Sequence, residues 1–215
     1  MANGKADERR ERTMAHARLD ILDAAVRAFA RTGLHGTTMQ DIAREAGYQA
    51  ASLYTYFKSK QEIVDGISNL LTDEYMQVFT QPVPSGLTFR QRFELVLQRQ
   101  LELVEKRRTT FMVFMSQEAS GRMCEAHDHS SSFHTNFERR VDCLADWLRR
   151  NATAEDLGGN DPRIIARLLF GMAFGLLHQW PDKMQPGSFV DYGPILTEFF
   201  FHGISSKPKT GARKK

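Results

Sequence analysis

The 215-residue sequence contains only two cysteines, Cys124 and Cys143. Two cysteines do not make a disulfide framework, and reduced thiols fit the cytosol, so we expect a cytoplasmic protein. Seven prolines and 15 glycines are too few for a fibrous or disordered chain. The longest run without charged or strongly polar side chains is residues 168–177. That run is about half of the roughly 20 residues that cross a bilayer, so we expect no membrane partner.

The net charge is also small, at +3, but the charged residues are unevenly distributed. Residues 1–60 hold ten Lys/Arg and seven Asp/Glu, whereas residues 61–206 hold 14 and 19. The last nine residues hold five basic residues and no acidic one. A basic N-terminal region followed by an acidic region indicates that a polyanion would bind the N-terminal region. The basic tail is interpreted as a disordered, solvated end, with nonspecific attraction to phosphates as the alternative.

Apolar residues recur with the period of a helix along most of the chain, and no alternating strand pattern stands out. The sequence therefore predicts an all-α protein of about nine helices. The expected segments are a first helix that ends at Gly33, then 38–46, 50–57, a long helix that starts after Ser59 and stops near Pro82, 89–104, 110–123, 133–148, 162–179 and 189–203.

Two short segments, 38–46 and 50–57, are joined by about three residues that include Gly47. This spacing is typical of a helix-turn-helix, whose second helix enters the major groove of DNA. With Leu53 and Phe57 facing inward, the outward side chains of the second helix are small or neutral, and none is a carboxylate. Such a surface approaches a polyanion without repulsion, and basic residues follow it at Lys58 and Lys60.

The segment GLHGTTMQDIAREAGYQAASLYTYFKSKQEIV resembles the TetR-type family of bacterial transcription regulators. The matching motif residues are Gly36-Thr37-Thr38, Ile42-Ala43, Gly47, Leu53-Tyr54, Phe57 and Lys60. The resemblance is dense over residues 18–68, and beyond them only the order of the helices resembles the family.

The resemblance implies an N-terminal three-helix DNA-binding domain and a larger C-terminal helical domain for ligand binding and dimerisation. The expected divisions are a flexible arm (1–15), the helix-turn-helix domain (16–62), the effector-binding and dimerisation domain (63–204) and a disordered tail (205–215). The expected partners are a double-stranded DNA operator, a second copy of the chain and a small, mostly hydrophobic effector. Repression is the family's usual mode, and we expect it here.

The resemblance also assigns residues to DNA contact. Those expected to hold phosphates, or the helix ends against them, are Thr38, Gln40, Tyr54, Tyr56 and Lys60. Those expected nearest the bases are Gln49, Ala50, Ala51, Ser52 and Thr55. Gln49 is the favoured specificity residue because glutamine can bind adenine through paired hydrogen bonds. It stands where the family usually has a hydroxyl residue that caps the helix. For Tyr54 and Tyr56, packing between helices is the alternative.

Phenylalanine and methionine are concentrated in the second half of the chain. The resemblance makes an effector pocket the interpretation, and ordinary core is the alternative for each residue. The candidate pocket residues are Phe111, Phe114, Met115, Phe133, Phe137, Trp147, Phe170, Phe174 and His178. Two glycines four apart and an apolar last helix predict a dimer surface. Its candidate residues are Gly171, Gly175, Ile195, Leu196, Phe199 and Phe200.

Cys124, His127, His129 and His134 lie within eleven residues and include ligand types for zinc or nickel. Their spacing matches no familiar finger, so a loop with incidental histidines is preferred and no metal or cofactor is expected. An enzyme is the main alternative class, but the chain has no HExxH, GxSxG, phosphate-loop or dinucleotide glycine pattern. A helical interaction module that never contacts DNA is the other alternative. We therefore expect a regulator and not an enzyme.

Overall fold

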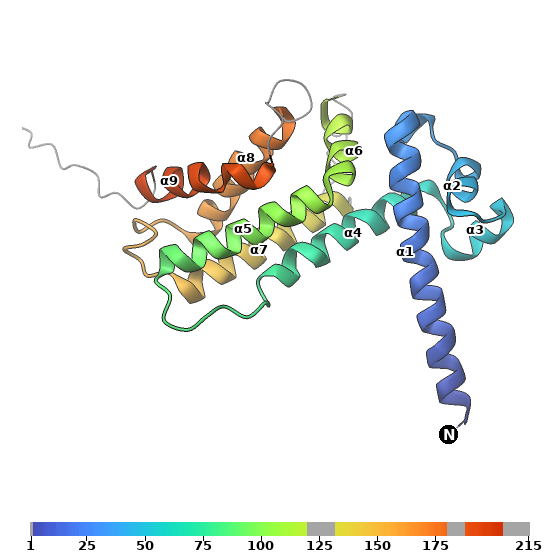
Figure 1. Cartoon of the computed structure of the whole chain (residues 1–215), viewed down its shortest axis with the longest axis horizontal. Helices are drawn as coiled ribbons and strands as arrows, with labels where there is room; N and C mark the ends of the chain where they lie inside the picture. Colours follow the sequence, from blue (N-terminus) through green and yellow to red (C-terminus); the bar gives the residue numbers. More distant parts are fainter. Residues whose placement is uncertain (1, 120–131, 180–187, 204–215) are drawn as a thin grey trace, which may run out of the picture. The chain divides into compact units, whose positions relative to one another are not determined.

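The computed structural model describes residues 2–119, 132–179 and 188–203, and all its regular elements there are helical (Figure 1). The elements are α1 (Ala2–Gly36), α2 (Met39–Ala46), α3 (Ala50–Tyr56), α4 (Lys60–Val78), α5 (Phe89–Lys106), α6 (Arg108–Ala119), α7 (Ser132–Asn151), α8 (Pro162–Gln179), the 3-10 turn η1 (Phe189–Tyr192) and α9 (Gly193–Gly203). The predicted all-α class is confirmed. Within the described part of the chain, no helix is both long and apolar enough to cross a membrane.

The chain divides into two compact units, each assembled from two separate stretches of sequence. Unit 1 comprises residues 1–71 and 107–135, and unit 2 comprises residues 72–106 and 136–215. The structure thus groups the segment 107–135 with the N-terminal helices, whereas the sequence predicted one boundary at residue 62. The difference arises because packing between distant segments decides the division, and helical periodicity carries no information about such packing.

Unit 1 has a single apolar core at which five helices meet. The fully or nearly fully buried side chains include Ile21 and Phe29 of α1, Ile42 of α2, Leu53 of α3 and Ile63 of α4. Val113 of α6 joins this cluster with 8% of its surface exposed. Directly before α6, Arg107 Nη1 donates a hydrogen bond to Asp23 Oδ1 of α1 at 3.3 Å. The first turns of α6 are therefore part of the unit that holds the helix-turn-helix.

Helix α1 begins at Ala2, where the sequence predicted a flexible arm over residues 1–15. The stretch from Ala6 to Leu19 contains neither proline nor glycine, and it is rich in alanine, glutamate and arginine, which are good helix formers. Adding residues to an existing helix costs far less than starting one, so the anchored part of α1 extends toward the N-terminus. An ion pair between Glu8 and Arg12, four residues apart, supports the extension.

Unit 2 is built around an aromatic core on α5, α7, α8 and α9. Phe93 of α5 stacks on Phe200 of α9 with ring centroids 4.3 Å apart, and Trp147 of α7 is 4% exposed. The last helical segment starts as the 3-10 turn η1, capped by Ser188, before α9 begins at Gly193. The sequence predicted one helix over residues 189–203, whereas the structure has two consecutive helical elements there.

Candidate nucleic-acid interface

The start of α2 is fixed by a complete capping box. Thr38 Oγ1 accepts a hydrogen bond from the Asp41 amide at 3.2 Å, and Asp41 Oδ2 accepts one from the Thr38 amide at 3.0 Å. The Thr38 hydroxyl also donates to Asp41, and these bonds lower the pKa of the Asp41 carboxyl. Thr38 therefore fixes the start of α2, while Gln40 lies exposed on the first turn.

The turn between α2 and α3 depends on Gly47, whose φ of 75° lies in the left-handed region. Gly47 closes α2 by donating its amide to the Arg44 carbonyl at 3.3 Å, and the Tyr48 amide bonds the Ala43 carbonyl at 2.8 Å. A side chain with a Cβ is strained at this φ, so glycine is the residue that makes the turn short. Gln49 then occupies the N-cap position of α3 with an extended backbone, and its side chain makes no capping hydrogen bond.

Helix α3 separates its residues into an inward and an outward set. Leu53 and Phe57 are fully buried, and Ala50 and Tyr56 pack half-buried against the same core. Tyr56 also contacts Tyr48 edge-on, with ring centroids 5.7 Å apart. The exposed members of the predicted set are Gln49, Ala51, Ser52, Tyr54 and Thr55. The structure thus brings five of the predicted DNA-contacting residues together on one carboxylate-free surface, which we call the α3 face.

Lys60 is committed to the protein backbone. Its Nζ donates to the carbonyl oxygens of Leu34 at 2.8 Å, Thr37 at 2.9 Å and His35 at 3.4 Å. These carbonyls lie at or just after the end of α1, where a helix has unpaired acceptors and a partial negative charge. Lys60 therefore caps α1 and joins it to the start of α4. A lysine has three N–H donors, and these contacts occupy them.

Replacing Lys60 by methionine should lower the free energy of unfolding by about 1–2 kcal/mol, because hydrogen bonds from a charged donor are lost at a helix end. Urea unfolding followed by circular dichroism measures the change. Lys58→Met is the matched control, since the exposed Lys58 Nζ bonds a single carbonyl, that of Tyr54 at 3.0 Å. Equal effects of the two substitutions would contradict a capping role for Lys60.

Sequence reasoning missed the contact of Arg18 with the end of α3. Arg18 Nη1 donates to the Tyr56 carbonyl, and its guanidinium lies 4.1 Å from the centroid of the Phe57 ring. Glu62 of α4 approaches the same guanidinium at 3.6 Å. Arg18 interrupts the apolar side of α1, and a charged residue at such a position was the available signal. The contact fixes the last turn of α3 against α1.

Glu45 connects α2 to α1 through two arginines. Its Oε1 accepts a hydrogen bond from Arg27 Nε at 2.8 Å, and its Oε2 accepts one from Arg31. Hydrogen bonds from Arg31 and then from Arg27 lower the pKa of Glu45 to about 2. The folded pKa lies below the ordinary value of 4.5, so the stabilising effect of this carboxylate is full above about pH 4.5. It is lost as the pH falls toward 2.

We expect Glu45→Gln to lower the melting temperature at pH 7 and to lower it progressively less as the pH falls from 4.5 toward 2. The charged interaction that the variant lacks is the one that acid removes from the wild-type protein. Thermal unfolding at a series of pH values measures the gap between the two proteins. A gap of constant size across that range would show that Glu45 does not act through its charge.

The predicted effector residues fall in both units. Phe111 and Phe133 belong to unit 1, and Phe111 packs against its core. In unit 2, the Phe170 ring lies 5.6 Å from Phe137 and 5.4 Å from Tyr75, with Trp147 in the same cluster. Phe174 is 40% exposed. The side chains of Phe114, Met115 and His178 lie outside the described residues.

The predicted dimer residues separate into two groups. Gly171, Gly175, Ile195 and Phe199 are exposed, and a Cβ on either glycine would meet nothing within 4 Å among the residues that the structure describes. Leu196 and Phe200 are 5% and 0% exposed, so they belong to the protomer's own core. Sequence reasoning missed Ile164 and Leu168 of α8, which are 57% and 54% exposed. We call the exposed apolar residues Ile164, Leu168, Phe174, Ile195 and Phe199, with the two glycines, the α8–α9 face.

Of the candidate metal ligands, Cys124, His127 and His129 lie outside the described residues, and His134 is half-buried in α7. Over the ranges that the structure covers, no three His, Cys, Asp or Glu side chains are grouped to hold a metal ion.

The sequence of this chain is similar to those of known transcription regulators. Residues 21–67 match the family described as bacterial regulatory proteins, tetR family. The HTH-type transcriptional repressor KstR2 of Rhodococcus jostii is 30% identical over 120 residues, which are 56% of this chain and 59% of that repressor. The chain thus spans little more than half the length of this relative.

Two solved structures show the same fold over most of the chain. The regulator FadR from Bacillus subtilis, in complex with stearoyl-CoA, has a TM-score of 0.70 at 20% identity, covering 86% of this chain and 98% of FadR. AibR, in complex with isovaleryl coenzyme A and operator DNA, has a TM-score of 0.62 at 19% identity, covering 86% of this chain and 98% of AibR. At these identities the likeness establishes the fold alone. The match over residues 21–67, together with the helix-turn-helix geometry, identifies this N-terminal segment as that of the TetR-type family of bacterial transcription regulators.

Proposed function

We propose that this protein is a homodimeric transcriptional repressor that binds a near-palindromic operator and leaves it when a small, mostly hydrophobic effector binds. The α3 face carries the proposal, because it is an exposed, carboxylate-free surface on a helix whose two ends are both fixed. Such a surface suits insertion into the major groove, where side chains meet base edges. Gln49, Tyr54 and Thr55 offer hydrogen-bonding groups there.

The α8–α9 face supports the dimer. Four large apolar side chains are more than half exposed in one protomer, and no described residue approaches a Cβ on either glycine, so this face favours burial against a second copy. A two-fold dimer would place two α3 helices about 34–36 Å apart, the spacing of successive major grooves. The described Gly171, Gly175, Ile195 and Phe199 would lie in that contact, together with Ile164 and Leu168.

The relatives suggest the effector class to test first. FadR was solved with stearoyl-CoA and AibR with isovaleryl coenzyme A, so we propose an acyl-CoA thioester as the effector here. An apolar acyl chain suits the phenylalanine-rich second half of the sequence. We place the protein in the cytoplasm, where a repressor meets its operator, and we propose a binding protein without catalytic activity.

Selection of duplexes from a random library by the full-length chain, followed by fluorescence anisotropy, tests DNA binding. The variant Gln49→Ala/Tyr54→Ala should lose most affinity for the selected duplex while its melting temperature stays close to that of the wild type, since both side chains are exposed. Gln98→Ala, exposed on α5, is the control for a surface glutamine outside the α3 face. Failure to enrich any duplex would refute the proposal and favour an interaction module.

Stearoyl-CoA added to the protein–duplex complex tests the effector class, with free coenzyme A as the control. Release by the thioester alone would support an acyl-CoA effector. Release by neither compound would refute that class without affecting the result of the duplex selection.

A further inference from the structure

Tyr48 is a half-buried tyrosine in the turn that leads into α3. It stands directly before the N-cap residue Gln49, and its amide is fixed by the bond to the Ala43 carbonyl at 2.8 Å. Its ring packs against the core of unit 1 and meets the ring of Tyr56 edge-on, with an angle of 68° between the ring planes. The backbone and the ring of Tyr48 are therefore both held in place. We call Tyr48 and Tyr56 the tyrosine pair.

The tyrosine pair lies on the flank of α3, between the α3 face and the core. Tyr56 follows the exposed Ser52 by four residues and the buried Leu53 by three, so it lies between the sides of the helix that these two residues occupy. The Tyr48 ring meets Tyr56 on this flank. A helix with its side chains is about 10–12 Å across, and the major groove of DNA is about 12 Å wide. Side chains on the flank of a helix in the groove therefore face the phosphates that line it.

The hydroxyl groups of the tyrosine pair are open to water. Within the described residues neither hydroxyl forms a hydrogen bond, and neither is one of the buried polar atoms that lack a partner. Each tyrosine thus combines a ring that packs on the core with a hydroxyl at the surface. A donor on a ring that is already fixed loses little conformational freedom when it binds a ligand.

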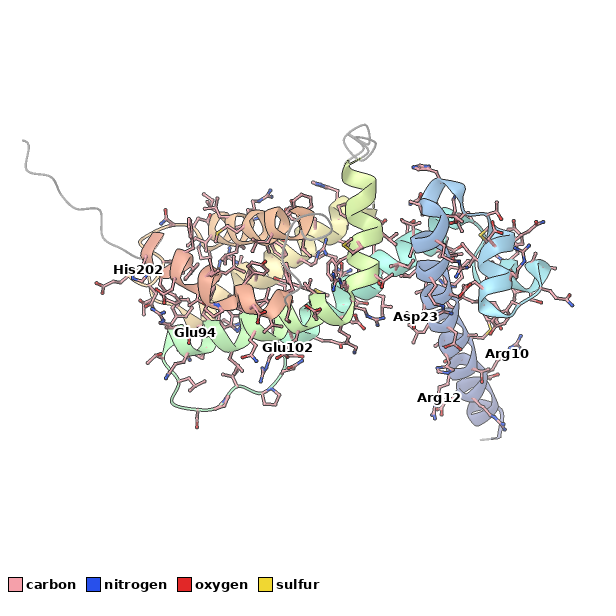
Figure 2. The ribbon with its side chains drawn as sticks, turned by 45° about the horizontal axis from the view of Figure 1, so that its top comes forward. Arg10, Arg12, Asp23, Glu94, Glu102 and His202 are labelled. Atoms are coloured by element: carbon pink, nitrogen blue, oxygen red, sulfur yellow. The ribbon has the colours of Figure 1, made fainter. Side chains whose placement is uncertain are left out.

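The chain around the tyrosine pair carries no unpaired carboxylate. No acidic residue occurs between Glu45 and Glu62. Glu45 is bonded by two arginines of α1, and Glu62 is paired with Arg18 at 3.6 Å. Figure 2 shows Asp23 of α1 on the side away from α2 and α3, where Arg107 bonds it. A phosphate beside the pair therefore meets no uncompensated negative charge from this segment.

We propose that Tyr48 is a further DNA-contacting residue, whose hydroxyl donates a hydrogen bond to a phosphate at the edge of the groove that α3 enters, while Tyr56 holds its ring. This inference rests on the proposed function and adds a contact to the α3 face. Tyrosine hydroxyls are among the side-chain donors that hold DNA phosphates, and such contacts fix the position of a protein on the duplex without reading its sequence. Position 48 is not one of the motif residues that match the family, so the structure alone selects it.

The test compares Tyr48→Phe with the wild-type chain on the duplex that the wild-type chain selects. The substitution keeps the ring and removes only the hydroxyl. Affinity should fall about tenfold per protomer, the effect of losing one hydrogen bond to a charged group. The slope of log affinity against log salt should stay the same, because the lost donor is neutral and neutralises no phosphate. Anisotropy over a series of salt concentrations measures both quantities.

Duplexes with one neutral methylphosphonate at a time identify the phosphate. At the phosphate that Tyr48 binds, this replacement should weaken the wild-type chain about tenfold more than it weakens Tyr48→Phe. At the other phosphates the two proteins should lose affinity equally. If no position distinguishes the two proteins, the inference is wrong.

The matched control is Tyr192→Phe, which removes a hydroxyl from a half-buried tyrosine of unit 2 whose ring lies 5.8 Å from that of Phe189. It should bind the duplex like the wild type, and an equal loss in this control would overturn the inference. The melting temperature of Tyr48→Phe should be unchanged, because the hydroxyl bonds none of the described residues. If Tyr48→Ala weakens DNA binding but Tyr48→Phe does not, Tyr48 acts through packing alone and the inference is overturned.

Two further outcomes separate this inference from the proposed function. If the wild-type chain selects no duplex, the proposed function fails and this inference fails with it. If a duplex is selected and Tyr48→Phe loses affinity for that duplex but not for versions altered at one base pair, Tyr48 contacts a base. The inference of a phosphate contact is then wrong, while the proposed function stands.

Discussion

Ile195→Glu/Phe199→Glu should convert the proposed dimer into monomers at micromolar concentration. Each side chain is more than half exposed in the protomer, at 60% and 68%, and burial of such a side chain contributes about 1.5 kcal/mol or more. Four side chains per dimer give about 6 kcal/mol, which is roughly a 10⁴-fold weaker association. Sedimentation velocity measures the change.

Leu19→Glu is the control for this substitution, since Leu19 is an exposed apolar residue of α1 in unit 1. It should leave the dimer intact. Duplex affinity should fall in the double variant because a monomer presents one α3 helix instead of two. A dimer of unchanged strength would show that the α8–α9 face is not the contact between protomers.

Phe57→Ala should destabilise unit 1 by about 3–5 kcal/mol, the range for deleting a buried phenylalanine ring. Phe57 is fully buried, lies under the Arg18 guanidinium at 4.1 Å and is 3.4 Å from the position of a Cβ on Gly66. Its loss removes the packing that holds the end of α3. We expect both a lower melting temperature and loss of duplex binding, measured by circular dichroism and anisotropy.

Tyr54→Ala on the same helix separates stability from DNA contact. Tyr54 is 47% exposed, so its removal should change the free energy of unfolding by no more than about 0.5 kcal/mol. Its duplex affinity should fall nevertheless. If Phe57→Ala were as stable as Tyr54→Ala, the core of unit 1 would not depend on the ring.

The local features of the helix-turn-helix were predictable because each is encoded within four residues. Asp41 stands three residues after Thr38, and Gly47 follows the segment 38–46, and the structure has a capping box and a left-handed residue at these positions. Ser59 and Glu62 have the same spacing, but the capping box there forms only in part. Ser59 Oγ accepts the Glu62 amide at 3.1 Å, but the Glu62 carboxylate accepts from the amide of Lys58, one residue before the expected donor.

Contacts between distant segments could not be predicted from the sequence. Lys60 lies 23–26 residues from the carbonyls that it bonds, and Arg18 lies 38 residues from Tyr56. Residue type and spacing carry no record of such pairs. The family motif identifies Lys60 as a matching residue, whereas the geometry shows which atoms it binds.

The last helix, α9, shows a different limit on what can be predicted from the sequence. Residues 195–201 are apolar on nearly every side, so helical periodicity does not separate Leu196 and Phe200 from Ile195 and Phe199. Stacking of Phe200 on Phe93 of α5 decides which pair faces inward. Only the arrangement of neighbouring helices could make that distinction.

The discontinuous composition of unit 1 has a practical consequence for work with fragments. A polypeptide that ends at Leu71 contains all three helices of the helix-turn-helix domain but lacks Val113, Phe111 and the Arg107 partner of Asp23. The surface of α1 that these side chains cover would then face water, and such newly uncovered apolar surface promotes self-association. Excised N-terminal pieces and fusions that join a foreign domain after α4 would therefore need α6 supplied by other means.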